Sequence, residues 1–350
     1  MLGMRIVIAP DCFTGTLSAG QAAEAIAAGW RAAARTAAGE PPDLDLVPLS
    51  DGGPGFAAVL GQAFGVRLRE VRVRGPLGQP VTARWLLANG TAYVESAEAA
   101  GLHLVPPAVR DPLAASSFGV GQLLRAALEA GPERVVVGLG GSATTDGGAG
   151  LLDALGAPGW PAGVPLVAAT DVDSPLLGPD GAARTFGPQK GADARQVAVL
   201  EERLSELAGR IGPRYASVAG AGAAGGLGFA LLTLGATRVP GAALVVEATR
   251  LADRLAGSAL VVTGEGSYDA QSLRGKVVTA VARAALDAGV PCLVLAGQVQ
   301  IGRRHAAATG VEALYSVADA AGSVGAALAR PAHHLELLAA RVAREWTVRP

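Results

Sequence analysis

Short, almost entirely apolar segments alternate with alanine-rich segments along most of this chain. Alternating strands and helices are typical of a parallel sheet with helices on both faces. Strands that are buried on both faces read as continuous apolar runs, as these segments do. The sequence therefore predicts an α/β fold. The predicted strands are Arg5–Pro10, Leu44–Leu49, Arg134–Leu139, Val164–Thr170, Ala259–Thr263 and Val290–Ala296.

Two regions interrupt this alternation. Arg67–Glu95 reads as strands joined by turns, and Pro175–Gly191 is rich in glycine and proline, with a helix expected near Gln196–Ile211. A chain of 350 residues is long enough for two domains. We therefore predict a smaller α/β domain inserted into a Rossmann-like one. The expected ranges are 1–66, 112–156 and 246–350 for the Rossmann-like domain, and 67–111 with 157–245 for the second.

Three helix starts can be read from the sequence. Ser18 and Gln21 have the spacing of a capping box, which predicts a helix from there to about Arg35. Ser117 is expected to cap a helix that continues to about residue 130. Gly275 and Lys276 lead into the apolar pattern of a further predicted helix, Val277–Ala288.

The composition excludes several classes of protein. Half of the residues are apolar and the formal net charge is −1, which argues against disorder, a nucleic-acid groove or an anionic membrane surface. Two cysteines, Cys12 and Cys292, fit a reducing cytosol better than a disulfide scaffold. The uncharged stretch Tyr215–Thr237 contains six glycines, so we interpret it as a buried loop and helix. We expect a soluble cytoplasmic protein, a monomer or homodimer, without nucleic-acid or membrane partners.

Carboxylates and glycines follow the predicted strands. Because the carboxyl ends of parallel strands meet at one edge of a sheet, this edge is where ligands bind in open α/β folds. A single aspartate after a strand is more often a turn residue than a functional one, but five such positions point to a site. The carboxylates are Asp11, Asp51, Asp146, Asp171 and Glu265.

Converging carboxylates and glycine loops suit a metal-bound polyphosphate, since carboxylates hold Mg²⁺ and backbone amides hold phosphate oxygens. Of the 29 basic residues only Lys190 and Lys276 are lysines. A lysine retained in an arginine-rich chain points to a place that needs a compact ammonium.

One competing motif is present. The spacing Gly220-x-Gly222-x-x-Gly225 matches a dinucleotide fingerprint, although the segment before it is not a convincing strand. An NAD(P)-dependent oxidoreductase therefore stays open as an alternative. No Walker A motif is present, since Val277 follows Gly275-Lys276.

Taken together, the motifs resemble the bacterial glycerate kinase family of the D-glycerate 2-kinase type, from Met4 to about Ala321. The opening strand and loop to Ser18 are similar to the family's first motif, and Leu49–Gly55 is similar to its second. The further matching segments are Val137–Gly150, Ala169–Pro179, Phe186–Gly191 and Gly264–Gln271. Three residues depart from the family pattern. Thr14 replaces a lysine, Pro54 a glutamate and Thr145 an asparagine, and the loss of the lysine leaves a non-catalytic nucleotide-binding relative as a further alternative.

The resemblance implies ATP- and Mg²⁺-dependent phosphorylation of D-glycerate to 2-phospho-D-glycerate in a cleft between two α/β domains. We expect direct in-line transfer, with the catalytic residues Asp171, Asp11, Lys276 and Lys190. Asp171 or Asp11 would act on the acceptor hydroxyl, and Lys190 or an unidentified arginine would pair with the glycerate carboxylate. The residues expected to hold the nucleotide are Gly140, Gly141, Ser142, Thr144, Asp146 and Asp51. Glu265 and Asp269 are the expected Mg²⁺ ligands.

Overall fold

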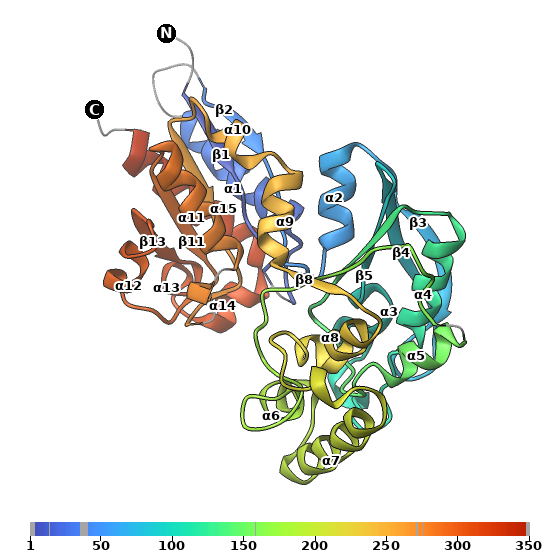
Figure 1. The fold of residues 1–350 in the computed structure, drawn as a ribbon. Coiled ribbons are helices and arrows are strands. Elements are labelled where there is room, and N and C mark those ends of the chain that lie inside the picture. The colour runs from blue at the N-terminus through green and yellow to red at the C-terminus, as the bar shows by residue number, and fades with distance from the viewer. Residues whose placement is uncertain are drawn as a thin grey trace. The chain divides into compact units, whose positions relative to one another are not determined.

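The chain leaves one sheet, builds a second and returns to the first. The structure is a computed structural model that describes residues 4–13, 15–35, 41–157, 159–270, 272–274 and 276–347. It consists of two units, which Figure 1 shows. Unit 1 comprises Met1–Ser50 and Ala242–Pro350, and unit 2 comprises Asp51–Gly241.

Unit 1 is built on a five-stranded parallel sheet with the strand order β13-β11-β9-β1-β2. Its strands are β1 (Arg5–Ile8), β2 (Asp43–Leu46), β9 (Leu260–Thr263), β11 (Cys292–Ala296) and β13 (Ala313–Ser316). A separate short pair joins β10 (Ser267–Tyr268) and β12 (Gln298–Val299). The helices are α1 (Ala19–Ala34), α9 (Gly241–Ala248), α10 (Leu251–Leu255), α11 (Val277–Ala288), α12 (Arg303–Ala307), α13 (Val317–Ala321), α14 (Val324–Ala329) and α15 (Pro331–Thr347).

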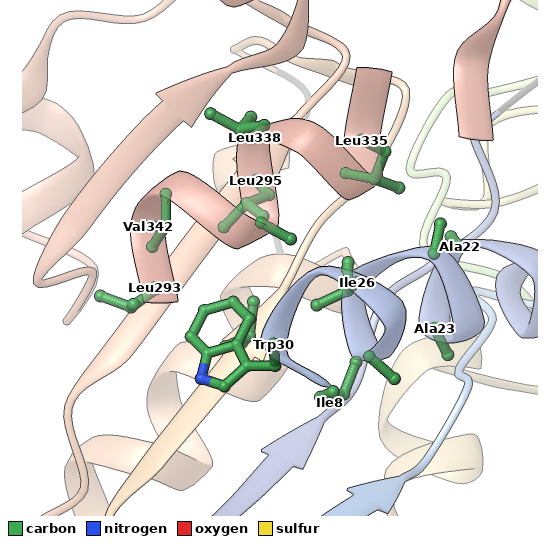
Figure 2. Packing of buried hydrophobic residues seen from close by; sticks show 14 of the residues in the cluster. Ile8, Ala22, Ala23, Ile26, Trp30, Leu293, Leu295, Leu335, Leu338 and Val342 are labelled. Carbon is green, nitrogen blue, oxygen red and sulfur yellow. The ribbon is translucent and has the colours of Figure 1, made fainter. Parts of the chain in front are cut away.

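The core of unit 1 lies between the sheet and the helices α1 and α15. Trp30 and Ile26 of α1 belong to the same buried cluster as Leu295 of β11 and Leu335 and Leu338 of α15, as Figure 2 shows. These side chains are at most 2% exposed, and burying each one stabilises the fold by about 1.5–3 kcal/mol.

The predicted capping box at the start of α1 is confirmed. Ser18 Oγ accepts a hydrogen bond from the Gln21 amide at 3.2 Å, and Gln21 Oε1 accepts one from the Ser18 amide at 2.9 Å. The two bonds satisfy amides at a helix end that have no partner within the helix.

Unit 2 is built on a six-stranded mixed sheet with the order β3-β4-β5-β6-β7-β8. The first three strands are antiparallel and the remaining pairs are parallel. The strands are β3 (Arg69–Arg74), β4 (Pro80–Ala88), β5 (Thr91–Glu95), β6 (Arg134–Gly138), β7 (Leu166–Ala169) and β8 (Thr237–Val239). The helices are α2 (Phe56–Phe64), α3 (Ala97–Ala100), α4 (Phe118–Glu129), α5 (Ala149–Leu155), α6 (Ala182–Phe186), α7 (Ala194–Ile211) and α8 (Ala223–Thr233).

The α/β fold class is confirmed, and each of the six predicted strands is present within a few residues of its expected bounds. The predicted division into domains differs from the two units. The range 112–156 was assigned to the Rossmann-like domain, but its strand β6 pairs with β5 and β7 in unit 2. Helix α2, expected in the same domain, also belongs to unit 2, which takes up more than half of the chain. The sequence shows β5 as the last of three consecutive strands, β3, β4 and β5, which form antiparallel pairs. It does not show that β5 also pairs in parallel with β6, so β6 was placed in the other domain.

The uncharged stretch Tyr215–Thr237 folds as a turn region followed by α8, whose side chains are largely buried in unit 2. None of the described helices is both long and apolar enough to cross a bilayer.

Candidate active site

In unit 1, two buried carboxylates follow neighbouring strands. Strands β1 and β9 are parallel with Ile8 opposite Val262, and the Asp11 amide donates to the Gly264 carbonyl at 2.8 Å. Asp11 and Glu265 therefore leave the sheet at the same edge, where they are 7% and 6% exposed. Asp11 Oδ1 also accepts from the Cys12 amide at 2.6 Å. The structure thus brings together two of the predicted site residues, at the edge where the sequence placed them.

Asp269 and Lys276 lie further along the same segment. The Asp269 amide donates to Ser272 Oγ at 3.1 Å, which tightens the turn after β10. Lys276 occupies the N-cap position of α11 with extended backbone and is partly buried, so the predicted helix start is confirmed. Thr14, Gln271 and Gly275, which the sequence analysis also considered, lie outside the described residues.

The oxygen donors of unit 1 fit Mg²⁺ in kind, because Mg²⁺ prefers carboxylates and keeps several positions for water and phosphate. Among the residues that the structure describes, no group of three or more metal-ligating side chains is present. A divalent ion at Glu265 and Asp269 would therefore depend on substrate phosphates for the rest of its coordination.

In unit 2, the loop after β6 is packed closely against the loop after residue 50. A Cβ atom on Gly140 would lie 2.6 Å from Gly53 Cα, and one on Gly141 would lie 2.5 Å from Pro54 Cγ. Gly141 also has a φ of +60°, which side chains rarely adopt. Asp51 Oδ1 accepts from the Gly53 amide at 2.9 Å and so shapes the second loop. Only glycine fits at these two positions of the first loop.

Parts of the first loop can receive an anion. The amides of Leu139 and Ala143 bond to backbone carbonyls, whereas those of Gly140 and Gly141 make no hydrogen bond to the described residues. Gly140 is partly exposed and Gly141 is exposed. Unpaired amides of this kind bind phosphate oxygens. The hydroxyls of Ser142 and Thr144, which we also expected on phosphate, are instead buried.

The buried side chain of Lys190 bonds to this loop. Its ammonium, 3% exposed as a residue, donates to Ser142 Oγ at 3.0 Å and to the Thr144 carbonyl at 2.6 Å. Burial lowers the pKa of Lys190 to about 7, against the opposing effect of Asp146. Its hydrogen bonds are thus with the loop, although the same side chain lines a small hollow together with Arg110, Asp111 and Ala143.

Asp146 has a structural role that the sequence analysis did not assign. Its carboxylate accepts hydrogen bonds from the Ser117 amide, the Ser117 hydroxyl and the amides of Gly148 and Gly150, at 2.8–3.2 Å. Four protein donors therefore fix the end of the loop to the starts of α4 and α5. Ser117 stands at the predicted N-cap position of α4, but its side chain bonds to Asp146 and to Leu151 rather than capping its own helix.

Asp171 follows β7 at a partly buried position. Nearby, Asp173 is held by Arg238 at 2.6 Å, an ion pair with one partly exposed partner. The role of Asp171 at an acceptor hydroxyl stays a prediction.

Glu95 was missed by the sequence analysis. It ends β5, is 2% exposed, and accepts from the amides of Gly55 at 3.0 Å and Ala57 at 3.1 Å. Burial, with a smaller contribution from the nearby Glu98, raises the pKa of Glu95 to about 7. The signal was similar to that at five of the six predicted strands, an apolar run with a carboxylate at its end, but it lay inside Arg67–Glu95, which was read as strands joined by turns and not searched for site residues.

The glycines of the competing dinucleotide motif have a structural role in packing. They follow the short 3-10 turn Pro213–Tyr215 rather than a strand, and Ala224, Gly225 and Gly226 have φ values of 51°, 73° and 94°. A Cβ on Gly225 would overlap the Thr144 carbonyl. These glycines let the chain approach the loop held by Lys190, so a strand–turn–helix fingerprint is not formed and the oxidoreductase alternative is not favoured.

The α/β fold, the carboxylates of unit 1 and the open amides of unit 2 are the features expected of an enzyme that binds phosphate groups. The sequence model of the Glycerate kinase family matches residues 6–162 and 158–347, so the chain belongs to this family of kinases.

Related proteins of the same name support this family assignment. The chain is 40% identical to a glycerate kinase of Bacillus subtilis, with 97% of each chain covered, and 38% identical to a glycerate 2-kinase of Escherichia coli, with 92% of each covered. A crystal structure of a putative glycerate kinase 2 from Salmonella typhimurium is 36% identical, with a TM-score of 0.74 over 99% of this chain and 98% of that one.

Proposed function

We propose that this protein transfers the γ-phosphoryl group of ATP to D-glycerate and forms 2-phospho-D-glycerate. Membership of the glycerate kinase family carries the proposal. The 2-position is favoured by the similarity to the E. coli relative named glycerate 2-kinase.

Phosphoryl transfer needs positioning and charge neutralisation more than covalent chemistry. The open amides of Gly140 and Gly141 would donate to phosphate oxygens, and Asp51 shapes the loop beside them. Lys276, at a helix N-terminus that already favours anions, would add a compact positive charge. Glu265 and Asp269 would hold Mg²⁺, which when bound supplies charge neutralisation between the phosphates.

The acceptor requires a carboxylate and an anion partner. Asp171 or Asp11 would orient the glycerate hydroxyl and take its proton. Lys190 and Arg110 line one hollow, and Arg110 is the arginine that we propose for the glycerate carboxylate. The Arg110 guanidinium already donates to the Gln189 carbonyl at 3.2 Å, which holds it near Lys190. We propose direct transfer without a covalent enzyme intermediate.

The test is an assay of ADP formation with Mg·ATP and D-glycerate, with L-glycerate as the control substrate. Enolase without a mutase converts only the 2-phosphate into phosphoenolpyruvate, so it reports the position of transfer. A γ-phosphate made chiral with oxygen isotopes should be inverted by a single direct transfer and retained by a two-step one. Absence of turnover together with stabilisation by Mg·ATP would instead identify a non-catalytic nucleotide-binding relative.

A further inference from the structure

Glu95 joins two segments of unit 2 that carry predicted nucleotide contacts. Its strand, β5, pairs in parallel with β6, and Glu95 lies opposite Gly138 at the start of the loop that contains Gly140. Both of its carboxylate oxygens accept from amides at the start of α2, directly after the loop that contains Asp51. Glu95 therefore ties this second loop to the sheet.

The two bonds are strongest with an ionised carboxylate. Oε1 accepts from Gly55 and Oε2 from Ala57, so each oxygen faces an N–H donor. A protonated carboxyl has one hydroxyl, which is a donor and cannot accept in the same way from the amide that it faces. Gly55, the N-cap of α2 with a φ of 98°, has no side chain that could replace the lost acceptor.

Few charged side chains of the described residues lie near Glu95. Helix α2 packs on this face, where its Phe56 ring contacts the Tyr93 ring of β5. The helix itself carries no titratable side chain. Glu98 of α3 lies near enough to repel the carboxylate, and Arg84 of β4 attracts it. These two are themselves paired at 2.8 Å. Of the other neighbours, Tyr93 lies on β5, Asp51 is held by the Gly53 amide, and Arg134 is at the opposite end of β6. Helix α4 packs with Ala92 and Val94, which alternate with Tyr93 and Glu95.

We propose that Glu95 is a positioning residue whose ionised carboxylate holds the Asp51–Gly55 loop in its working shape, and that proton uptake by Glu95 loosens this loop. The effect on turnover rests on the proposed function, because it assumes that the loop serves the nucleotide. The coupling of the Glu95 proton to the loop does not. The two amide bonds lower the pKa of Glu95, so when Glu95 stays buried its protonation favours the state in which these bonds are broken. Burial and Glu98 together bring the titration of Glu95 close to neutral pH, so the change falls where a cell can reach it.

The test compares the wild type with Glu95→Gln and Glu98→Gln from about pH 5.5 to about pH 9. For the wild type we expect kcat/KM for Mg·ATP to fall on the acid side, with an apparent pKa near 7. Glu95→Gln presents an NH₂ group to one of the two amides, so it should lose this acid limb and remain about tenfold or more below the wild-type plateau.

Glu98→Gln is the matched control. It keeps Glu95 and both amide bonds but removes the repelling charge and frees Arg84, so the plateau should stay and the limb should move to lower pH. Protonation of ATP itself cannot produce this shift, because the nucleotide is the same for both proteins. An acid limb unchanged in Glu98→Gln, or retained in Glu95→Gln, would overturn the proposal.

A second readout does not depend on turnover. Hydrogen exchange at the amides of Gly55 and Ala57 should accelerate in the wild type as the pH falls below about 7, beyond the intrinsic pH effect, and in Glu98→Gln only at lower pH. If wild-type protein shows this change but does not phosphorylate glycerate, the proposed function fails and the positioning role stands. Exchange that follows the intrinsic pH effect alone would overturn the positioning role, even with glycerate kinase activity present.

Discussion

The two units carry their polar chemistry in different ways. In unit 1, Asp11 and Glu265 follow their strands directly and lie buried at the same edge of the sheet. In unit 2, Lys190, Asp146 and Glu95 turn inward and bond to loops, and the groups left open are backbone amides. Unit 1 thus places two buried carboxylates at one edge of its sheet, whereas unit 2 uses charged side chains to shape loops that have open backbone amides. The first arrangement suits a metal and the second suits phosphate oxygens.

The largest effect expected from this contrast is in unit 1. Glu265→Gln keeps the shape of the side chain but removes the charge, so we expect turnover to fall about 100–1,000-fold, or about 2.7–4 kcal/mol of transition-state stabilisation. Steady-state kinetics with D-glycerate and a melting curve measure it. Asp287→Asn, an exposed carboxylate on α11 paired with Arg283, is the control and should behave as wild type. Turnover within threefold of wild type in Glu265→Gln would remove this residue from the reaction.

In unit 2 the corresponding change should act on stability. Lys190→Met leaves Ser142 Oγ and the Thr144 carbonyl without their donor, which should cost about 1–3 kcal/mol in the free energy of unfolding. Denaturant unfolding of both proteins measures the difference. An unchanged midpoint would show that the buried ammonium does not support the loop.

The pH dependence of that difference has a definite sign. The pKa of Lys190 is lowered from 10.5 to about 7 on folding, so between these values the unfolded chain binds the extra proton. The wild type should therefore gain stability relative to Lys190→Met as the pH rises above 7. Glu95, with a pKa raised from 4.5 to about 7, should do the opposite in the lower window. There the folded chain binds the extra proton, and wild-type stability relative to Glu95→Gln should fall as the pH rises toward 7. Unfolding curves at several pH values test both signs.

The same contrast explains what could be predicted from the sequence. Asp11 and Glu265 were predictable because each follows within two residues the strand that positions it. The same short stretch of sequence therefore indicates both the strand and the site residue. The contacts of Lys190 and Glu95 join residues 48 and 40 positions apart, and no local pattern encodes such a pairing. The amphipathic and capping patterns likewise predicted α1 and α11 within a residue or two. Strand order is non-local, so the assignment of β6 to a sheet was wrong although the strand itself was correct.

A smaller effect is expected at Lys276, again in unit 1. Lys276→Arg keeps the charge at the start of α11 but replaces a compact ammonium by a planar guanidinium. If the ammonium neutralises the transferred phosphoryl group, kcat should fall about tenfold, or about 1.4 kcal/mol, with the melting temperature nearly unchanged. Arg283→Lys on the exposed side of the same helix is the control. Wild-type turnover in Lys276→Arg would show that any cation suffices at this position.

The smallest expected effects are on stability, and they come from one helix N-cap substitution in each unit. Unit 1 has a capping box at Ser18, which the sequence predicted, and unit 2 has one at Asp193, whose Oδ1 accepts from the Gln196 amide at 2.7 Å. Ser18→Ala and Asp193→Ala should each cost about 1 kcal/mol, because an N-cap side chain satisfies an amide that has no partner inside the helix. Helix α1 packs in one buried cluster and α7 in another, so native-state hydrogen exchange should show the loss in α1 alone for the first variant and in α7 alone for the second. Equal loss of protection in both helices for either variant would mean that the units unfold as one, and the contrast drawn between them would then hold for chemistry but not for stability.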